Sequence, residues 1–177
     1  MSETISFKYV PLADSIIKEI DYDEVLGLFS KLETCIFIIG EKGEAYTENV
    51  MDFVNKLAKK HNITNVYLFD PTFINVYGEK ENMIDCKSLE IKLKYYAIVE
   101  KSHFKSDELV KDTLIPKIHV PFFMAIRNGS CVGYYTTQLI KDNNGRLHYE
   151  NDTKDMTQEF RDKMKELLSK MEYDKLF

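Results

Sequence analysis

Cysteine is scarce in this chain of 177 residues, and no two cysteines stand close together. The three are Cys35, Cys86 and Cys131, a spacing that gives neither a disulfide framework nor a zinc motif. Cys35 and Cys131 lie within apolar runs, where cysteine behaves as a small hydrophobic residue. Cys86 lies in a polar stretch and is the better candidate for a free thiol.

Long apolar runs and an excess of positive charge are also missing. No stretch approaches the roughly 20 apolar residues of a membrane-spanning helix. The start has no basic region followed by an apolar one, so we expect no secretory signal and a cytoplasmic location. The formal net charge is −5, with basic residues interleaved among acids. We therefore expect neither nucleic acid nor a membrane to be the main partner.

The first half of the chain alternates between strand and helix patterns. Residues 16–20 form a short β-like run, and Asp21 with Glu24 predicts a capping box for a helix over Asp23–Leu32. The apolar run over residues 34–39 is typical of a strand buried on both faces. Thr47 is predicted to cap the next helix, of about 14 residues, and residues 66–69 form another buried strand. Strand, helix and strand at this spacing predict a right-handed βαβ unit.

The strongest local signal is a hairpin in the second half. Pro121 opens an apolar run that ends at Ile126, and Asn128-Gly129 separates it from a second run over residues 131–135. An Asn-Gly turn between two such runs predicts a β-hairpin. Proline lacks an N–H for the ladder, so we expect it at the mouth of the strand, where a cis bond is tolerated.

Three further segments are predicted with less local guidance. Residues 89–97 fit both a strand and a helix, and the helix is favoured because Ser88 can cap it. Ser106 is predicted to cap a helix over residues 107–115 that Pro116 ends. The last helix is expected to begin near residue 152. Its apolar positions, which we assign to the core, are Met156, Phe160, Met164, Leu167, Leu168 and Met171.

The order of these elements, with Pro121 opening the fourth strand, resembles the thioredoxin fold. The match covers roughly residues 16–172, and the run from Cys35 to Gly40 is similar to the strand that leads into the redox site. More narrowly, residues 33–40 and 155–159 resemble bacterial thioredoxin-like proteins grouped with bacteriocin-transport accessory proteins. The resemblance implies an α/β three-layer sandwich with a mixed central sheet and helices on both faces. We expect residues 1–15 to form an N-terminal arm, and 16–177 one domain with a partly helical insertion at about 72–106.

The chain departs from that family at its chemical centre. The place of the Cys-x-x-Cys motif is held by Glu44-Ala45-Tyr46-Thr47, which contains no thiol. A thioredoxin attacks with a thiolate of lowered pKa at a helix N-terminus, and a second cysteine resolves the mixed disulfide. We therefore expect no dithiol–disulfide chemistry, no catalytic residue, no metal site and no cofactor.

Binding of a protein or an extended peptide is the favoured function. The resemblance implies a groove between the loop before the helix and the proline-led strand, where a peptide can add as a strand. The residues predicted to line it are Glu44, Ala45, Tyr46, Thr47, Val120 and Pro121, with Phe73 nearby.

Two other functions stay open. His119 with Glu41 or Glu44 could support acid–base or metal-assisted chemistry at the same place. Cys86 could act as a single redox thiol. The other histidines, His61, His103 and His148, show no metal-ligand spacing.

Overall fold

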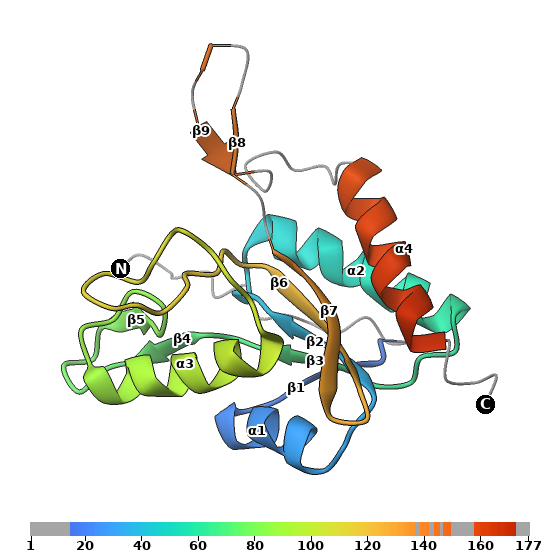
Figure 1. The fold of residues 1–177 in the computed structure, drawn as a ribbon, viewed down its shortest axis with the longest axis horizontal. Coiled ribbons are helices and arrows are strands. Elements are labelled where there is room, and N and C mark those ends of the chain that lie inside the picture. Colours follow the sequence, from blue (N-terminus) through green and yellow to red (C-terminus); the bar gives the residue numbers. More distant parts are fainter. Residues whose placement is uncertain (1–14, 137–138, 142–143, 146, 150–157, 173–177) are drawn as a thin grey trace, which may run out of the picture.

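The centre of the molecule is a five-stranded mixed sheet with the order β1-β3-β2-β6-β7 (Figure 1). The computed structural model describes residues 15–136, 139–141, 144–145, 147–149 and 158–172. β1, β3 and β2 run parallel, whereas β6 is antiparallel to β2, and β7 to β6. The sheet strands are β1 (Ile17–Glu19), β2 (Cys35–Ile39), β3 (Val66–Phe69), β6 (Phe122–Arg127) and β7 (Ser130–Thr136). Two small hairpins pair β4 (Thr72–Ile74) with β5 (Lys80–Asn82) and β8 (Leu139–Lys141) with β9 (Leu147–Tyr149).

Helices cover both faces of the sheet. α1 (Tyr22–Ser30) and α3 (Leu89–Ser102) pack on one face, and α2 (Ala45–Lys60) and α4 (Gln158–Glu172) on the other. Side chains of a strand point alternately to its two faces, so each buried strand feeds both layers. In β2, Cys35, Phe37 and Ile39 join the core under α1 and α3, and Ile36 and Ile38 join the core under α2 and α4. This explains why the run from residue 34 to 39 is apolar without interruption.

The predicted helix caps are confirmed at two helices. At α1, the Glu24 N–H donates to Asp21 Oδ1 at 2.8 Å, and the Asp21 N–H donates to Glu24 Oε1 at 3.3 Å. At α3, the Ser88 hydroxyl accepts from the Ile91 N–H at 3.4 Å. Residues 89–97 therefore belong to a helix, the favoured of the two alternatives.

The β6–β7 hairpin is also confirmed. Asn128 and Gly129 both have positive φ, 49° and 76°, as a two-residue primed turn requires. A Cβ on Gly129 would lie 2.5 Å from the carbonyl oxygen of Phe29, so this turn also packs against the end of α1. The Val120–Pro121 bond that precedes β6 is cis.

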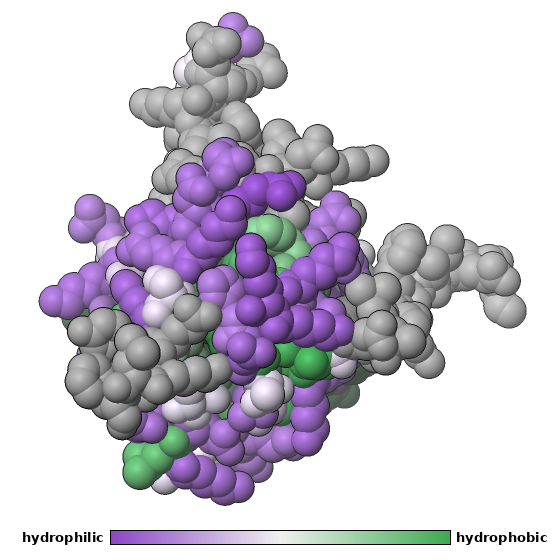
Figure 2. All heavy atoms as spheres, turned by 90° about the vertical axis from the view of Figure 1, so that its right-hand side faces the viewer, coloured by the Kyte–Doolittle hydropathy of each residue, from purple (hydrophilic) through white to green (hydrophobic). Residues whose placement is uncertain are grey.

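The apolar stripe of α4 faces the core, as predicted. Phe160, Met164, Leu167, Leu168 and Met171 are buried. The side of the molecule on which α4 lies is mainly hydrophilic at its surface (Figure 2). Met156, the predicted start of this helix and residues 1–14 of the predicted arm lie outside the described residues.

The predicted helix over residues 107–115 is wrong. This segment is a folded loop in which the Lys117 N–H donates to the Glu108 carbonyl at 2.9 Å and the Val110 N–H to the Ile115 carbonyl at 2.8 Å. Asp112 adopts a positive φ of 61°, which a helix does not allow. Val110 is buried, so one apolar anchor and cross-loop hydrogen bonds replace the helical pattern.

Residues 72–106, assigned from the sequence to a partly helical insertion, form the β4–β5 hairpin and α3. The division into an arm and one domain stays a prediction. In the part of the chain that the structure describes, no helix is both long and apolar enough to cross a membrane.

Candidate functional site

The strand directions gather five chain segments at one edge of the sheet. The parallel strands β1, β3 and β2 end there, and the antiparallel strand β6 begins there. Because Ile39 pairs with Phe122, Gly40 follows β2 beside Pro121. The end of β7 completes this edge, where Thr136 Oγ1 donates to the His119 carbonyl at 3.2 Å. Open α/β sheets bind ligands outside the carboxyl ends of their parallel strands, so this edge is the first place to look for a site.

Glu44 comes immediately before the first residue of α2. Its carboxylate accepts from the Thr47 N–H at 2.8 Å and from the Thr47 hydroxyl at 2.7 Å. The prediction that Thr47 caps this helix is wrong, because α2 begins at Ala45 and Thr47 is buried in its first turn. The negative charge of Glu44 also suits the positive end of the helix.

Ion pairs fix the loop between β2 and α2. The Lys42 ammonium lies 2.7 Å from Glu19 Oε1, and its backbone N–H donates to Asp70 Oδ2 at 3.1 Å. Glu41 Oε1 lies 2.9 Å from the Lys80 ammonium, which comes from the β4–β5 hairpin. Hydrogen bonding to Glu41 raises the pKa of Lys80, so the Lys80 ammonium stays charged at neutral pH.

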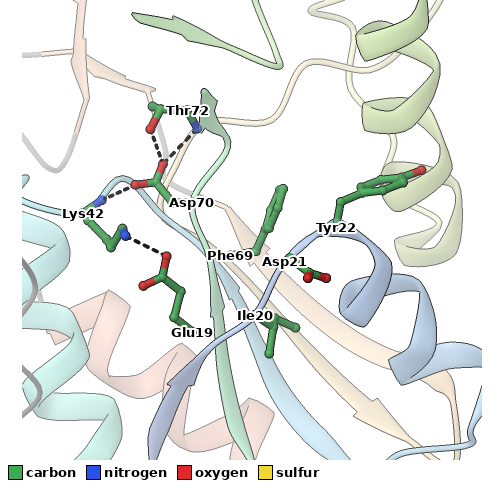
Figure 3. A pocket seen from close by; sticks show the side chains of 8 residues that line it. All are labelled: Glu19, Ile20, Asp21, Tyr22, Lys42, Phe69, Asp70 and Thr72. Carbon is green, nitrogen blue, oxygen red and sulfur yellow. Dashed lines mark hydrogen bonds and ion pairs between the residues drawn. The ribbon is translucent and has the colours of Figure 1, made fainter. Parts of the chain in front are cut away.

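Beside this loop lies an open hollow of about 620 Å³ (Figure 3). Asp70 forms its upper wall: Oδ1 accepts from the N–H and the hydroxyl of Thr72 at 2.9 Å and 2.7 Å. Ile20 and Phe69 give the hollow an apolar wall, and Lys42 with Glu19 gives it a charged one. The full lining is Glu19, Ile20, Asp21, Tyr22, Lys42, Phe69, Asp70 and Thr72.

The cysteines lie away from the start of α2, and burial raises the pKa of each thiol. The pKa of Cys35, in β2, rises to about 12 through burial, with a smaller contribution from Glu33. Cys86 is a free thiol, as are the other two cysteines, but it is buried and donates to the Met83 carbonyl at 3.4 Å. Cys131 is half-buried in β7. Cys35 and Cys131 each pair with Ile126, so they stand two strands or about 10 Å apart, too far for a disulfide.

The residues predicted to line a groove lie at this edge with different exposure. Glu44 and Val120 are half-buried, whereas Thr47 and Pro121 are buried. Ala45 and Tyr46 form the first turn of α2, and the structure describes only their backbone. Phe73 lies in β4 and packs on the core beneath α1 and α3.

His119 pairs with a carboxylate other than the two that the acid–base alternative named. Its Nε2 lies 2.7 Å from Glu108 Oε2, whereas Glu41 pairs with Lys80 and Glu44 with Thr47. Glu108 comes from the loop that the sequence had assigned to a helix, and the pair ties this loop to the segment before β6. Among the described residues, no three His, Cys, Asp or Glu side chains are grouped closely enough to hold a metal ion.

No single pattern in the sequence indicates the residues that build the hollow. Asp70, Lys42 and Glu19 lie on three segments that are far apart in sequence, and only the strand order brings them together. One signal was available: Asp70-Pro71-Thr72 directly follows a buried strand, and an aspartate commonly accepts from the N–H two residues on.

Comparison with solved structures finds a weak likeness to a thioredoxin. The crystal structure of thioredoxin O2 from Arabidopsis thaliana in its oxidised state is similar at a TM-score of 0.37 and 10% identity. The likeness covers 72% of this chain and 86% of that one. No family model and no curated protein matches the chain.

The topology itself decides the fold class. Three parallel strands precede a proline-led antiparallel strand and its hairpin partner, with two helices on each face. The fold is thioredoxin-like. The fold class expected from the sequence is therefore confirmed, as a three-layer sandwich around a mixed sheet.

Proposed function

We propose that this thioredoxin-like protein does not carry out dithiol–disulfide exchange and instead binds an extended peptide at the carboxyl edge of its sheet. The observation that carries the first half is the contact between Glu44 and Thr47. The resemblance puts these residues at the two positions of the family's thiols, and the Thr47 hydroxyl donates to the Glu44 carboxylate at 2.7 Å. The thiols present elsewhere have raised pKa values, which keeps them protonated near neutral pH.

A fixed binding edge supports the second half of the proposal. The loop over residues 40–44 is held from both sides, by Glu19 and Asp70 through Lys42 and by Lys80 through Glu41. A loop already held in one geometry loses little conformational entropy when a ligand binds. Ion pairs and the Glu44 cap therefore hold this edge in one geometry before a ligand binds.

The distances along the edge suit a short extended segment. Val120 lies before β6, and the hollow lies between the ends of β1 and β3. Two strand spacings separate β3 from β6, about 10 Å, which three extended residues span. One side chain of the bound peptide would enter the hollow while its backbone passes Val120. Peptide binding of this kind would suit an accessory protein, the class that the resemblance to bacteriocin-transport accessory proteins implies.

Selection from a random peptide library on the immobilised protein tests this proposal. We expect enriched peptides to lose at least tenfold in affinity for Val120→Asp and to keep their affinity for Val132→Asp. Val132 is a matched control because it is a half-buried valine on β7 that packs on the other core cluster. Circular dichroism establishes that both variants are folded. If the enriched peptides bind both variants equally well, the proposed location of the binding site is wrong.

Insulin reduction by dithiothreitol tests the redox half separately. We expect the protein to leave the uncatalysed rate unchanged, because no described thiol lies at the start of α2 and burial keeps the thiols protonated. Turnover clearly above the rate without protein would overturn this half and leave the peptide test standing.

A further inference from the structure

A second hollow, of about 470 Å³, shares no lining residue with the first. It opens between the segment before α3, the first turns of α3 and the loop over residues 107–117. This loop is the one whose fold the sequence did not predict. The lining residues are Asp85, Cys86, Lys87, Lys92, Val110, Lys111 and Asp112.

The rim of this hollow concentrates positive charge on an acidic chain. Lys87, Lys92 and Lys111 line it, against the carboxylates of Asp85 and Asp112. Asp85 is already balanced, since its Oδ1 lies 3.1 Å from the ammonium of Lys117. Counting Lys117 and also Glu81, whose charge acts on the Cys86 thiol, four positive groups face three negative ones, an excess of one, while the whole chain carries −5. Such a reversal of sign attracts anions to one spot.

The floor of the same hollow is apolar and ordered. Val110 and Cys86 are buried there, and the Cys86 thiol donates to the Met83 and Ser88 carbonyls at 3.4 Å and 3.7 Å. The Lys92 ammonium donates to the Lys111 carbonyl at 3.4 Å, which joins α3 to the loop across the hollow. Lysine stems add apolar surface below their charged ends. A ligand with a charged head and an apolar body would satisfy both parts of this lining.

We propose that this hollow binds a small phosphate monoester with an apolar body. A doubly charged phosphate group matches three lysine ammonium groups better than a single carboxylate does, and lysine serves phosphate as a mobile point charge. The volume lies within the range of small-ligand pockets, about 300–1,000 Å³. The site is independent of the peptide edge, because the two hollows share no lining residue.

Calorimetric titration of the full-length protein with phenyl phosphate tests the proposal, with inorganic phosphate in parallel. We expect saturable binding that is tighter for phenyl phosphate than for inorganic phosphate. Lys92→Gln with Lys111→Gln should weaken binding at least about tenfold, since two charges near the ligand are lost. Lys163→Gln with Lys165→Gln is the control of equal charge change on α4, and it should bind as the unmodified chain does.

Asp112→Asn provides a test that misfolding cannot imitate. This substitution removes a carboxylate from the rim, and asparagine tolerates the positive φ of 61° at this position. We expect phenyl phosphate to bind at least about threefold more tightly. The proposal is overturned if phenyl phosphate shows no saturation by about 10 mM, if the two lysine double variants bind alike, or if Asp112→Asn fails to tighten binding.

Discussion

At the scale of single residues, the chemistry of this protein is decided by where carboxylates and thiols stand. Glu44 accepts two hydrogen bonds at the start of α2, a position where a thiol would be activated. Cys35, by contrast, lies inside β2 with no exposed surface, and burial raises its pKa to about 12. A thiol buried in this way contributes to packing, and it also makes the folded state sensitive to alkali.

Cys35 should lower the stability of the protein above pH 9. Its pKa is raised in the folded state, so its contribution is fully present below the unfolded pKa of about 9 and is lost as the pH rises toward 12. Between pH 9 and 10 this loss amounts to roughly 1 kcal/mol. Urea unfolding of the unmodified chain and Cys35→Ala at pH 7, 9 and 10 measures it. Between pH 9 and 10, the free energy of unfolding of Cys35→Ala should fall by that much less than that of the unmodified chain. Equal falls in both proteins would contradict the assignment of this loss to Cys35.

At the scale of elements, the sequence was a good guide wherever a local pattern faced a continuous core. The unbroken apolar run of β2, the capping box of α1 and the Asn-Gly turn of the β6–β7 hairpin each carry their information within a few residues. The loop over residues 107–117 carries little of that kind. Its conformation depends on Tyr95 of α3, which is distant in sequence, and so a serine and a proline suggested a helix that does not form.

Tyr95→Phe should loosen this loop. The buried Tyr95 hydroxyl donates to the Pro116 carbonyl at 2.7 Å and accepts from the Ile118 N–H at 2.9 Å. Removing it leaves two backbone groups without that partner, at a cost of about 1–3 kcal/mol in the free energy of unfolding. Amide exchange at Ile118 should also quicken, whereas Tyr96→Phe, on the exposed side of α3, should change neither quantity. Unchanged exchange at Ile118 would show that the hydroxyl does not hold the loop.

At the scale of the whole molecule, the candidate site is a product of topology rather than of any motif. The sequence placed Glu44, Val120 and Pro121 near one another through a resemblance, and the strand register brings Gly40 beside Pro121. The sequence did not indicate the Lys42–Glu19 ion pair or the pairing of His119 with Glu108, because each joins segments that only the folded chain brings together. Long-range polar pairs of this kind leave no periodic signature in a sequence.

The fold itself should still support thiol chemistry if the thiols are restored. In Glu44→Cys with Thr47→Cys, the new cysteines take positions whose side chains already converge, with Glu44 Oε2 and Thr47 Oγ1 2.7 Å apart. The first cysteine would stand immediately before α2, where the helix N-terminus lowers a thiol pKa. We therefore expect this double variant to form a disulfide in air and to reduce insulin faster than the unmodified protein.

A pair that cannot close provides the control for that experiment. Thr47→Cys with Glu48→Cys introduces the same number of thiols, but adjacent residues on a helix do not face each other. It should therefore remain unable to turn over insulin, and mass spectrometry should find its thiols still reduced. If both double variants behave alike, the start of α2 lacks the geometry of a thioredoxin site. The absence of thiol chemistry that we propose would then depend on the backbone of this edge as well as on the side chains of Glu44 and Thr47.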